Sequence, residues 1–180
     1  MESTHQQAKL KAELEKMFAH ARGEIFEDGM ESDFSRNLVA LIEQHQEPAI
    51  AALAELIAGD EVNAEVASEA LRWVVHIENP ATHQARLTLL EHSLSAPSAR
   101  VRDGAALGLA SMDDPASIDS VQEAINHECI EQLRQNLEQV LEQLVETRDE
   151  QSSLTTMLDS EEVLRRDWDS DAEDDTWAYL

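Results

Sequence analysis

Cysteine, glycine, proline and aromatic residues are all scarce in this chain of 180 residues. It has one cysteine, Cys129, with five glycines, four prolines, three tryptophans, three phenylalanines and one tyrosine. A single cysteine excludes a disulfide within the chain and a Cys-x-x-Cys ligand pair, which suits a reducing compartment. Few glycines and prolines, with abundant alanine, leucine and glutamate, leave long segments that favour helix. The composition therefore predicts an all-α protein.

Positive charge is also scarce. Lysine and arginine together number 13 against 38 acidic residues, so the formal net charge is −25. The three lysines all lie within residues 9–16, and no basic stripe follows them. Because phosphate binding needs clustered basic side chains, we expect no direct binding of nucleic acid or of an anionic membrane. The charge instead predicts a basic partner.

The chain also lacks a long apolar run. The longest, AIAALAELIAG at residues 49–59, is about half the length that crosses a bilayer. The polar N-terminal segment has no apolar core of the kind found in signal peptides. We therefore expect a soluble cytoplasmic protein.

Motifs of catalytic and metal sites are missing from the sequence. There is no Gly-rich phosphate loop, no Gly-x-Ser-x-Gly and no His-Glu-x-x-His. Cys129 has no sequence cue for a neighbouring base. Among the seven histidines, the candidates His76, His83 and His92 are not spaced as convergent ligands. We therefore expect no enzymatic activity, no metal and no cofactor.

Three prolines mark a repeat. Each follows an acidic or asparagine residue, in the pairs Glu47-Pro48, Asn79-Pro80 and Asp114-Pro115. A capping residue followed by proline is a common helix start, since the missing N–H of proline costs nothing there. The prolines are separated by 32 and then 35 residues, which indicates units of nearly constant length.

The second and third units align without a gap. Residues 63–82, NAEVASEALRWVVHIENPAT, match residues 98–117, SARVRDGAALGLASMDDPAS, and apolar residues recur on one helical face in both. A looser copy covers residues 33–57. Each unit is predicted to be a helix, a short acidic turn and a second helix that begins with proline. Such a hairpin cannot bury its apolar face alone and must pack on its neighbours.

Two features of these units allow a second interpretation. Gly104 and Gly108 are spaced like a membrane Gly-x-x-x-Gly motif, but Arg102 and Asp103 adjoin them in a helix too short to span. Close packing between soluble helices is therefore favoured. Trp73, which aligns with Gly108, lies beside the apolar row, so packing is favoured over a ligand platform.

The repeats have a family resemblance. Residues 98–125, SARVRDGAALGLASMDDPASIDSVQEAI, resemble the short HEAT-like repeats of phycobilisome-lyase-like proteins in their Val-Arg pair, paired small residues and Asp-Pro turn. The resemblance covers residues 32–146 and implies a right-handed solenoid of helical hairpins, but no particular function. We divide the chain into an N-terminal helix or cap (1–31), a repeat domain (32–148) and an acidic tail (149–180).

The last core helix is expected at residues 128–146, as a cap on the stack. Its sequence, ECIEQLRQNLEQVLEQLVE, predicts one buried face. The residues on that face are Ile130, Leu133, Leu137, Val140, Leu141 and Leu144.

The acidic tail combines charge with aromatic residues. Its final 22 residues carry nine acids against Arg165 and Arg166, and self-repulsion predicts disorder apart from a helical turn at SEEVLRR, residues 160–166. Yet Trp168, Trp177 and Tyr179 lie in the last 13 positions. Aromatic residues dominate interface hot spots, so the pattern predicts a tail that folds on a positively charged partner.

The tail has a resemblance of its own. Residues 161–180, EEVLRRDWDSDAEDDTWAYL, resemble the C-terminal tail of many small bacterial antitoxins, approximately Leu-x-x-Asp-Trp-x-x-x-x-Glu-Asp-x-x-Trp-x-x-Leu. The matched positions are Leu164, Asp167, Trp168, Glu173, Asp174, Trp177 and Leu180. Asp171 and Thr176 replace a common proline and alanine.

This second resemblance implies a partner. The tail would wrap a cognate toxin, often a basic endoribonuclease of the MazF/PemK type, with Trp168 and Trp177 as anchors and Leu164 and Leu180 as apolar contacts. Carboxylates at Asp167, Glu173 and Asp174 would mimic phosphates, and the aromatic residues, Tyr179 included, would mimic stacked bases in the toxin's substrate groove.

Two functional hypotheses follow from the sequence. In the first, the chain is an antitoxin whose tail masks the groove of a toxin. Such antitoxins usually carry a small DNA-binding or dimerising domain, which a HEAT-like domain replaces here, so promoter binding is not expected. In the alternative, the chain is a HEAT-repeat adaptor that binds another protein through its concave face. An enzyme is the third and least favoured hypothesis.

Overall fold

The computed structural model describes residues 2–27, 29–59 and 62–168, and the side chains of 6–27, 29–59 and 62–157. The described part of the chain is helical and has no strands, which confirms the all-α prediction. In chain order its helices are α1 (Glu2–Ala21), α2 (Asp33–His45), α3 (Glu47–Ile57), α4 (Ala64–Trp73), α5 (His83–Ser93), α6 (Ala99–Met112), α7 (Ile118–His127) and α8 (Glu131–Trp168). Short 3₁₀ helices η1 (Val74–His76), η2 (Pro80–Thr82) and η3 (Pro115–Ser117) lie between them.

The three prolines lie where the repeat predicts a second helix to begin. Pro48 is in the first turn of α3, and Pro80 and Pro115 begin η2 and η3, which lead into α5 and α7. The two later turns have the same hydrogen bonds. The side chain of Asn79 accepts from the Ala81 N–H at 3.0 Å, and that of Asp114 accepts from the Ala116 N–H at 2.9 Å. The gap-free alignment of these units is thus confirmed at their turns.

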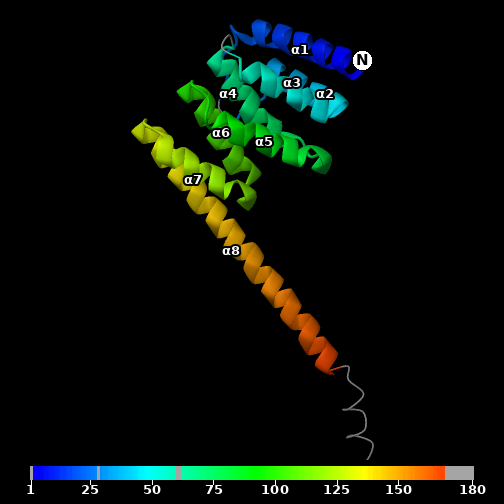
Figure 1. The fold of residues 1–180 in the computed structure, drawn as a ribbon, viewed down its shortest axis with the longest axis vertical. Coiled ribbons are helices and arrows are strands. Elements are labelled where there is room, and N and C mark those ends of the chain that lie inside the picture. The colour runs from blue at the N-terminus through cyan, green and yellow to red at the C-terminus, as the bar shows by residue number, and fades with distance from the viewer. Residues whose placement is uncertain (1, 28, 60–61, 169–180) are drawn as a thin grey trace, which may run out of the picture.

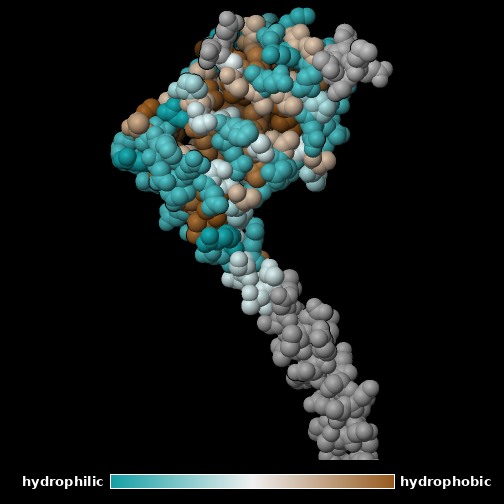
Figure 2. All heavy atoms as spheres, in the orientation of Figure 1, coloured by the Kyte–Doolittle hydropathy of each residue, from teal (hydrophilic) through white to brown (hydrophobic). Residues whose placement is uncertain are grey.

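The helices pack on one another in sequence, α2 on α3, α3 on α5, α5 on α6 and α7 on α8. Helix α2 lies against α4, α3 against α5 and α4 against α6, while α1 covers α2 and α3 at one end and α8 covers α6 and α7 at the other (Figure 1). A continuous apolar core fills the space between the helices. On the face that Figure 2 shows, polar side chains cover much of the surface, and apolar side chains are visible between them. We call α1–α7 and residues 131–147 of α8 the body.

Helix α1 packs on α2 and α3 through one apolar face. Its buried residues are Leu10, Leu14, Phe18 and Ala21, which lie on one face because they are three or four positions apart. The ring of Phe18 meets Phe34 of α2 edge to face, with centroids 5.2 Å apart. This contact joins α1 to α2.

The two glycines of α6 allow it to approach α4. A Cβ atom at Gly104 would lie 2.6 Å from the Ser68 Oγ and 2.8 Å from the Ser68 carbonyl oxygen. A Cβ atom at Gly108 would lie 2.6 Å from a methyl carbon of Leu90 and 3.0 Å from the Leu71 carbonyl oxygen. Both distances are shorter than van der Waals contact, so the predicted role in close helix packing is confirmed.

Helix α8 is longer than the sequence predicts. It continues without a break through residues 149–168, where the sequence predicted disorder with a single helical turn, so the predicted boundary at 148/149 falls inside one helix. No proline or glycine follows Pro115, and leucine, glutamate, glutamine and arginine are good helix formers, so nothing in this stretch ends the helix. The helical turn predicted at 160–166 is therefore part of a longer helix.

Candidate partner-binding surface

The first part of α8 is fixed to the body by an apolar face. Leu133, Leu137, Val140 and Leu144 are buried, as the sequence predicts. Leu141 is half-buried, and Ile130 is 45% exposed, which corrects its assignment to the buried face. The reason is that α8 begins at Glu131, so Ile130 lies in the connection before the helix and outside its register.

Polar contacts from the end of α6 support the same part of α8. Asp113 ends α6 in the left-handed conformation, with φ of 48°. Its carboxylate accepts hydrogen bonds from the side chains of Gln143, at 2.8 Å, and Thr147, at 2.9 Å. Gln143 also donates to the Ala110 carbonyl at 2.9 Å. Helix α8 is therefore held through Thr147 by both apolar and polar contacts.

A buried ion pair sets the position where α8 begins. The Nε and one Nη atom of Arg102 donate to the two carboxylate oxygens of Glu128 at 2.7 and 2.9 Å, and the side chain of Glu128 is 2% exposed. The Ile130 N–H donates to Glu128 at 2.9 Å, and Arg102 also donates to the carbonyls of Ala96 and Pro97. The pair joins the start of α6 to the α7–α8 connection, 26 residues away in sequence.

This pair shifts the acidity of both partners. The hydrogen bonds from Arg102 lower the pKa of the Glu128 carboxyl, against burial, which raises it, and the Ile130 N–H lowers it further. The hydrogen bond to Glu128 raises the pKa of Arg102 in turn. Because the folded state favours the ionised carboxylate, the pair stabilises the fold above the unfolded pKa of about 4.3, and this contribution is lost as the pH falls through the folded pKa.

We expect Glu128→Gln to lower the free energy of unfolding by about 2 kcal/mol at pH 7, because Arg102 loses its bidentate charged partner. The value is below that of a fully buried pair since Arg102 keeps two carbonyl partners and is itself partly exposed. Urea unfolding at several pH values tests this. The difference from the natural chain should shrink below about pH 4, and a constant difference at all pH values would contradict the electrostatic explanation.

Beyond Thr147 the helix leaves the body. Every residue from Arg148 to Met157 is exposed, and Figure 1 shows α8 projecting well past the other helices. We call residues 148–157 the arm. Its length gives about 15 Å of helix at about 1.5 Å per residue, held away from the other helices.

The residues that the tail resemblance singles out are only partly covered by the structure. Leu164, Asp167 and Trp168 lie in the last turns of α8, where the backbone is helical. Their side chains are outside the described part, and Glu173, Asp174, Trp177, Tyr179 and Leu180 lie wholly outside the described residues. Their role in binding remains a prediction from the sequence.

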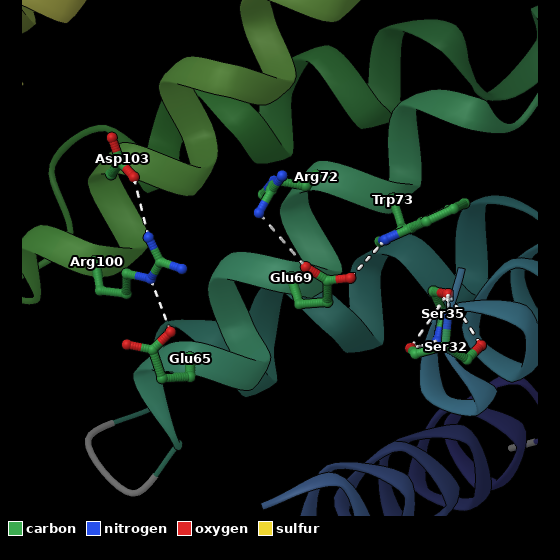
Figure 3. A network of polar contacts seen from close by, with 8 residues as sticks. All are labelled: Ser32, Ser35, Glu65, Glu69, Arg72, Trp73, Arg100 and Asp103. Carbon is green, nitrogen blue, oxygen red and sulfur yellow. Dashed lines mark hydrogen bonds and ion pairs between the residues drawn. The ribbon is translucent and has the colours of Figure 1, made fainter. Parts of the chain in front are cut away.

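Arginines on the α4 and α6 side of the body face carboxylates. The Nε atom of Arg100 donates to Glu65 at 2.8 Å across the two helices, and its Nη1 donates to Asp103 at 3.3 Å (Figure 3). Arg72 lies 3.8 Å from the buried carboxylate of Glu69. Carboxylates of the body thus neutralise the positive charges of Arg72 and Arg100.

Trp73 and two of the candidate histidines, His76 and His83, have partners within the fold. The Trp73 indole N–H donates to Glu69 at 2.6 Å (Figure 3). The centroid of the Trp73 ring lies 4.7 Å from that of the His76 ring. His83 contacts the Asp114 carboxylate at 2.6 Å and so joins two successive turns. Partial burial raises the pKa of Asp114, but hydrogen bonds from His83 and the Ala116 N–H outweigh it, so the pKa is lowered overall.

A cavity of about 720 Å³ opens between α5, α6 and α7. Its lining includes Glu91, His92, Arg102, Glu123, His127 and Cys129. No motif in the sequence predicts this cavity, and the one signal for this edge is the repeat offset of 35 residues, which aligns His92 with His127. Cys129 lies in the α7–α8 connection and is exposed, rather than at a helix start. Among the residues whose side chains are described, no three His, Cys, Asp or Glu side chains are grouped to hold a metal ion.

Comparison with protein-family models, with curated proteins and with solved structures finds no match to this chain. Within residues 2–27, 29–59 and 62–168, no helix is both long and apolar enough to cross a membrane. The functional interpretation therefore rests on the residues and on their geometry.

Proposed function

We propose that this chain is an antitoxin-like protein that neutralises a basic toxin by placing its C-terminal segment in the toxin's substrate groove. The toxin class that fits the charge and the tail pattern is an endoribonuclease of the MazF/PemK type. In this proposal the body is a right-handed HEAT-like solenoid, and residues 161–180 make the inhibitory contacts.

One observation carries the proposal. Helix α8 is packed through Thr147 and exposed from Arg148 to Met157, so the acidic C-terminal segment continues from a helix that leaves the body. A helix needed only to close the core could end where its buried face ends, at Leu144. The excess length favours a role in which the C-terminal segment reaches another molecule.

Charge supports the same partner. Residues 149–180 contain eleven acidic residues against two arginines. A groove that binds RNA is basic, so attraction would speed the encounter, and binding would weaken as salt is added. Anchoring by Trp168 and Trp177 would supply apolar contact area that charge alone lacks.

A co-expression experiment tests the proposal. The full-length chain and a chain ending at Arg148 are each expressed with the product of the adjoining gene, and the complexes are isolated. We expect only the full-length chain to retain the toxin and restore growth. The shortened chain keeps every core residue identified above, so its thermal unfolding should stay cooperative. Retention of the partner by residues 1–148 would contradict the proposal.

The adaptor hypothesis is the second candidate, and the cavity between α5, α6 and α7 is the observation that favours it. In this case the body itself binds another protein, and the shortened chain retains that partner. The same co-expression experiment therefore separates the two functions.

A further inference from the structure

The arm exposes two large apolar side chains. Leu154 is 60% exposed and Met157 is 67% exposed. They are three residues apart, so they lie on the same side of the helix. The body covers neither of them, whereas the apolar residues on the packed part of α8, such as Leu137 and Leu144, are buried. Neighbouring exposed apolar side chains on one surface are typical of an interaction site.

The polar side chains around this pair have hydrogen bonds within the helix. The hydroxyls of Ser153 and Thr155, which flank the pair, donate to the carbonyls of Asp149 and Gln151, four residues earlier, at 2.9 Å. A hydroxyl that already has a partner can be covered by another protein without losing its hydrogen bond. The surface around Leu154 and Met157 is therefore easier to remove from water than its serine and threonine content suggests.

Charge is also absent from this stretch. Residues 151–157, QSSLTTM, contain no ionisable side chain, while Asp149 and Glu150 precede them and Asp159 follows. An uncharged centre with a charged border is the arrangement found in protein interfaces. Serine and threonine are only moderate helix formers, so contact with a partner would also stabilise the helix here.

We propose that the arm is a helical docking surface for the basic partner, with Leu154 and Met157 as its apolar anchors. This inference rests on the proposed function and extends the contact from residues 161–180 back along α8. The arm binds in an apolar cleft of that partner, with basic residues at the edge of the cleft. The partner is the same protein that receives the C-terminal segment.

Charge complementarity and continuity favour this occupant over a second copy of the chain. Two copies would bring together two C-terminal segments that each carry eleven acids against two arginines, and like charges repel. The arm also leads along one helix directly into residues 161–168. A partner bound to that segment therefore lies close to Leu154 and Met157.

The test replaces Leu154→Gln together with Met157→Gln in the full-length chain. Glutamine is a good helix former, so the change removes apolar surface and preserves helix propensity. The matched control, Ser152→Gln with Thr156→Gln, introduces the same residues on the opposite face, about 160° around the helix from Leu154. The probe is the protein used in the co-expression experiment, encoded by the gene next to the one for this chain. Titration calorimetry measures the affinity of each variant for this probe.

We expect the apolar pair of substitutions to weaken binding at least about tenfold and the control pair to change it by less than about threefold. Circular dichroism should show equal helix content in both variants. Unchanged affinity of the Leu154→Gln/Met157→Gln variant, while replacement of both tail tryptophans abolishes binding, would overturn this inference and leave the proposed function standing. Failure of the unmodified chain to bind the probe overturns both. Slower sedimentation of the free Leu154→Gln/Met157→Gln variant than of the free unmodified chain would show that the arm mediates self-association. That result would also overturn the inference.

Discussion

Replacement of both tail tryptophans, Trp168→Ala and Trp177→Ala, is expected to weaken toxin binding at least about a thousandfold and to abolish growth protection. Each tryptophan can bury about 150–250 Å², and truncation of a central interface tryptophan costs about 2–4 kcal/mol. Two such losses correspond to a change in affinity of three decades or more, since about 1.4 kcal/mol is tenfold. Titration calorimetry and rescue of growth measure the two consequences.

The matched control for this experiment replaces Ser170→Ala and Thr176→Ala, which lie between the positions of the antitoxin pattern. These substitutions should leave both binding and protection almost unchanged. Thermal unfolding of the body should be the same in all variants, because the core lies in residues 10–144. A double tryptophan variant that still protects cells would refute the tail mechanism, whatever the role of the body.

Gly104→Ala is expected to be the most damaging single-methyl change in the body, with a loss of about 3 kcal/mol in the free energy of unfolding. The added Cβ atom would lie 2.7 Å from the Cα of Ser68 and 2.8 Å from its carbonyl oxygen, and neither atom belongs to a flexible side chain. Helices α4 and α6 must therefore separate. For a chain of this size we expect a melting temperature about 6–12 °C lower.

Two other glycines calibrate this effect. Gly108→Ala should cost less, about 1 kcal/mol, because its shortest contact is with the flexible end of Leu90. Gly23→Ala should be neutral or slightly stabilising, since nothing lies within 4 Å of its added Cβ and alanine restricts the unfolded chain. Calorimetric melting curves of the three variants give the comparison. An equal loss at Gly104 and Gly23 would show that close packing is not the cause.

The helices and the turns between them could be predicted from the sequence because their signals are local. The Asn79-Pro80 and Asp114-Pro115 turns are specified by adjacent residues, and the periodic apolar face needs only a few turns of helix to be recognised. The buried face of α8 was predicted for the same reason. Ile130 was misassigned because the start of that helix depends on the Glu128 contacts with Arg102, which are distant in sequence.

The continuation of α8 was missed for a different reason. Composition suggested that residues after Arg148 lacked enough apolar surface to fold alone, and that remains true of the exposed arm. The helix nevertheless continues because its first part is fixed to α6 and α7, so the costly first turn is already formed and each further residue adds a hydrogen bond. A count of apolar residues cannot include this effect of a neighbouring segment.

The sequence by itself determined the helical class, the repeated Pro-containing turns and the acidic charge, and it predicted a Trp-containing C-terminal contact. These properties depend on composition and on spacings of a few residues. Only the tertiary structure decided that α4 and α6 meet at Gly104, that Arg102 and Glu128 fix the start of α8, and that Leu154 and Met157 lie exposed outside the body. Contacts between residues far apart in the chain depend on how the helices pack, and it is packing that leaves one face of α8 buried at Leu144 and exposed after Thr147.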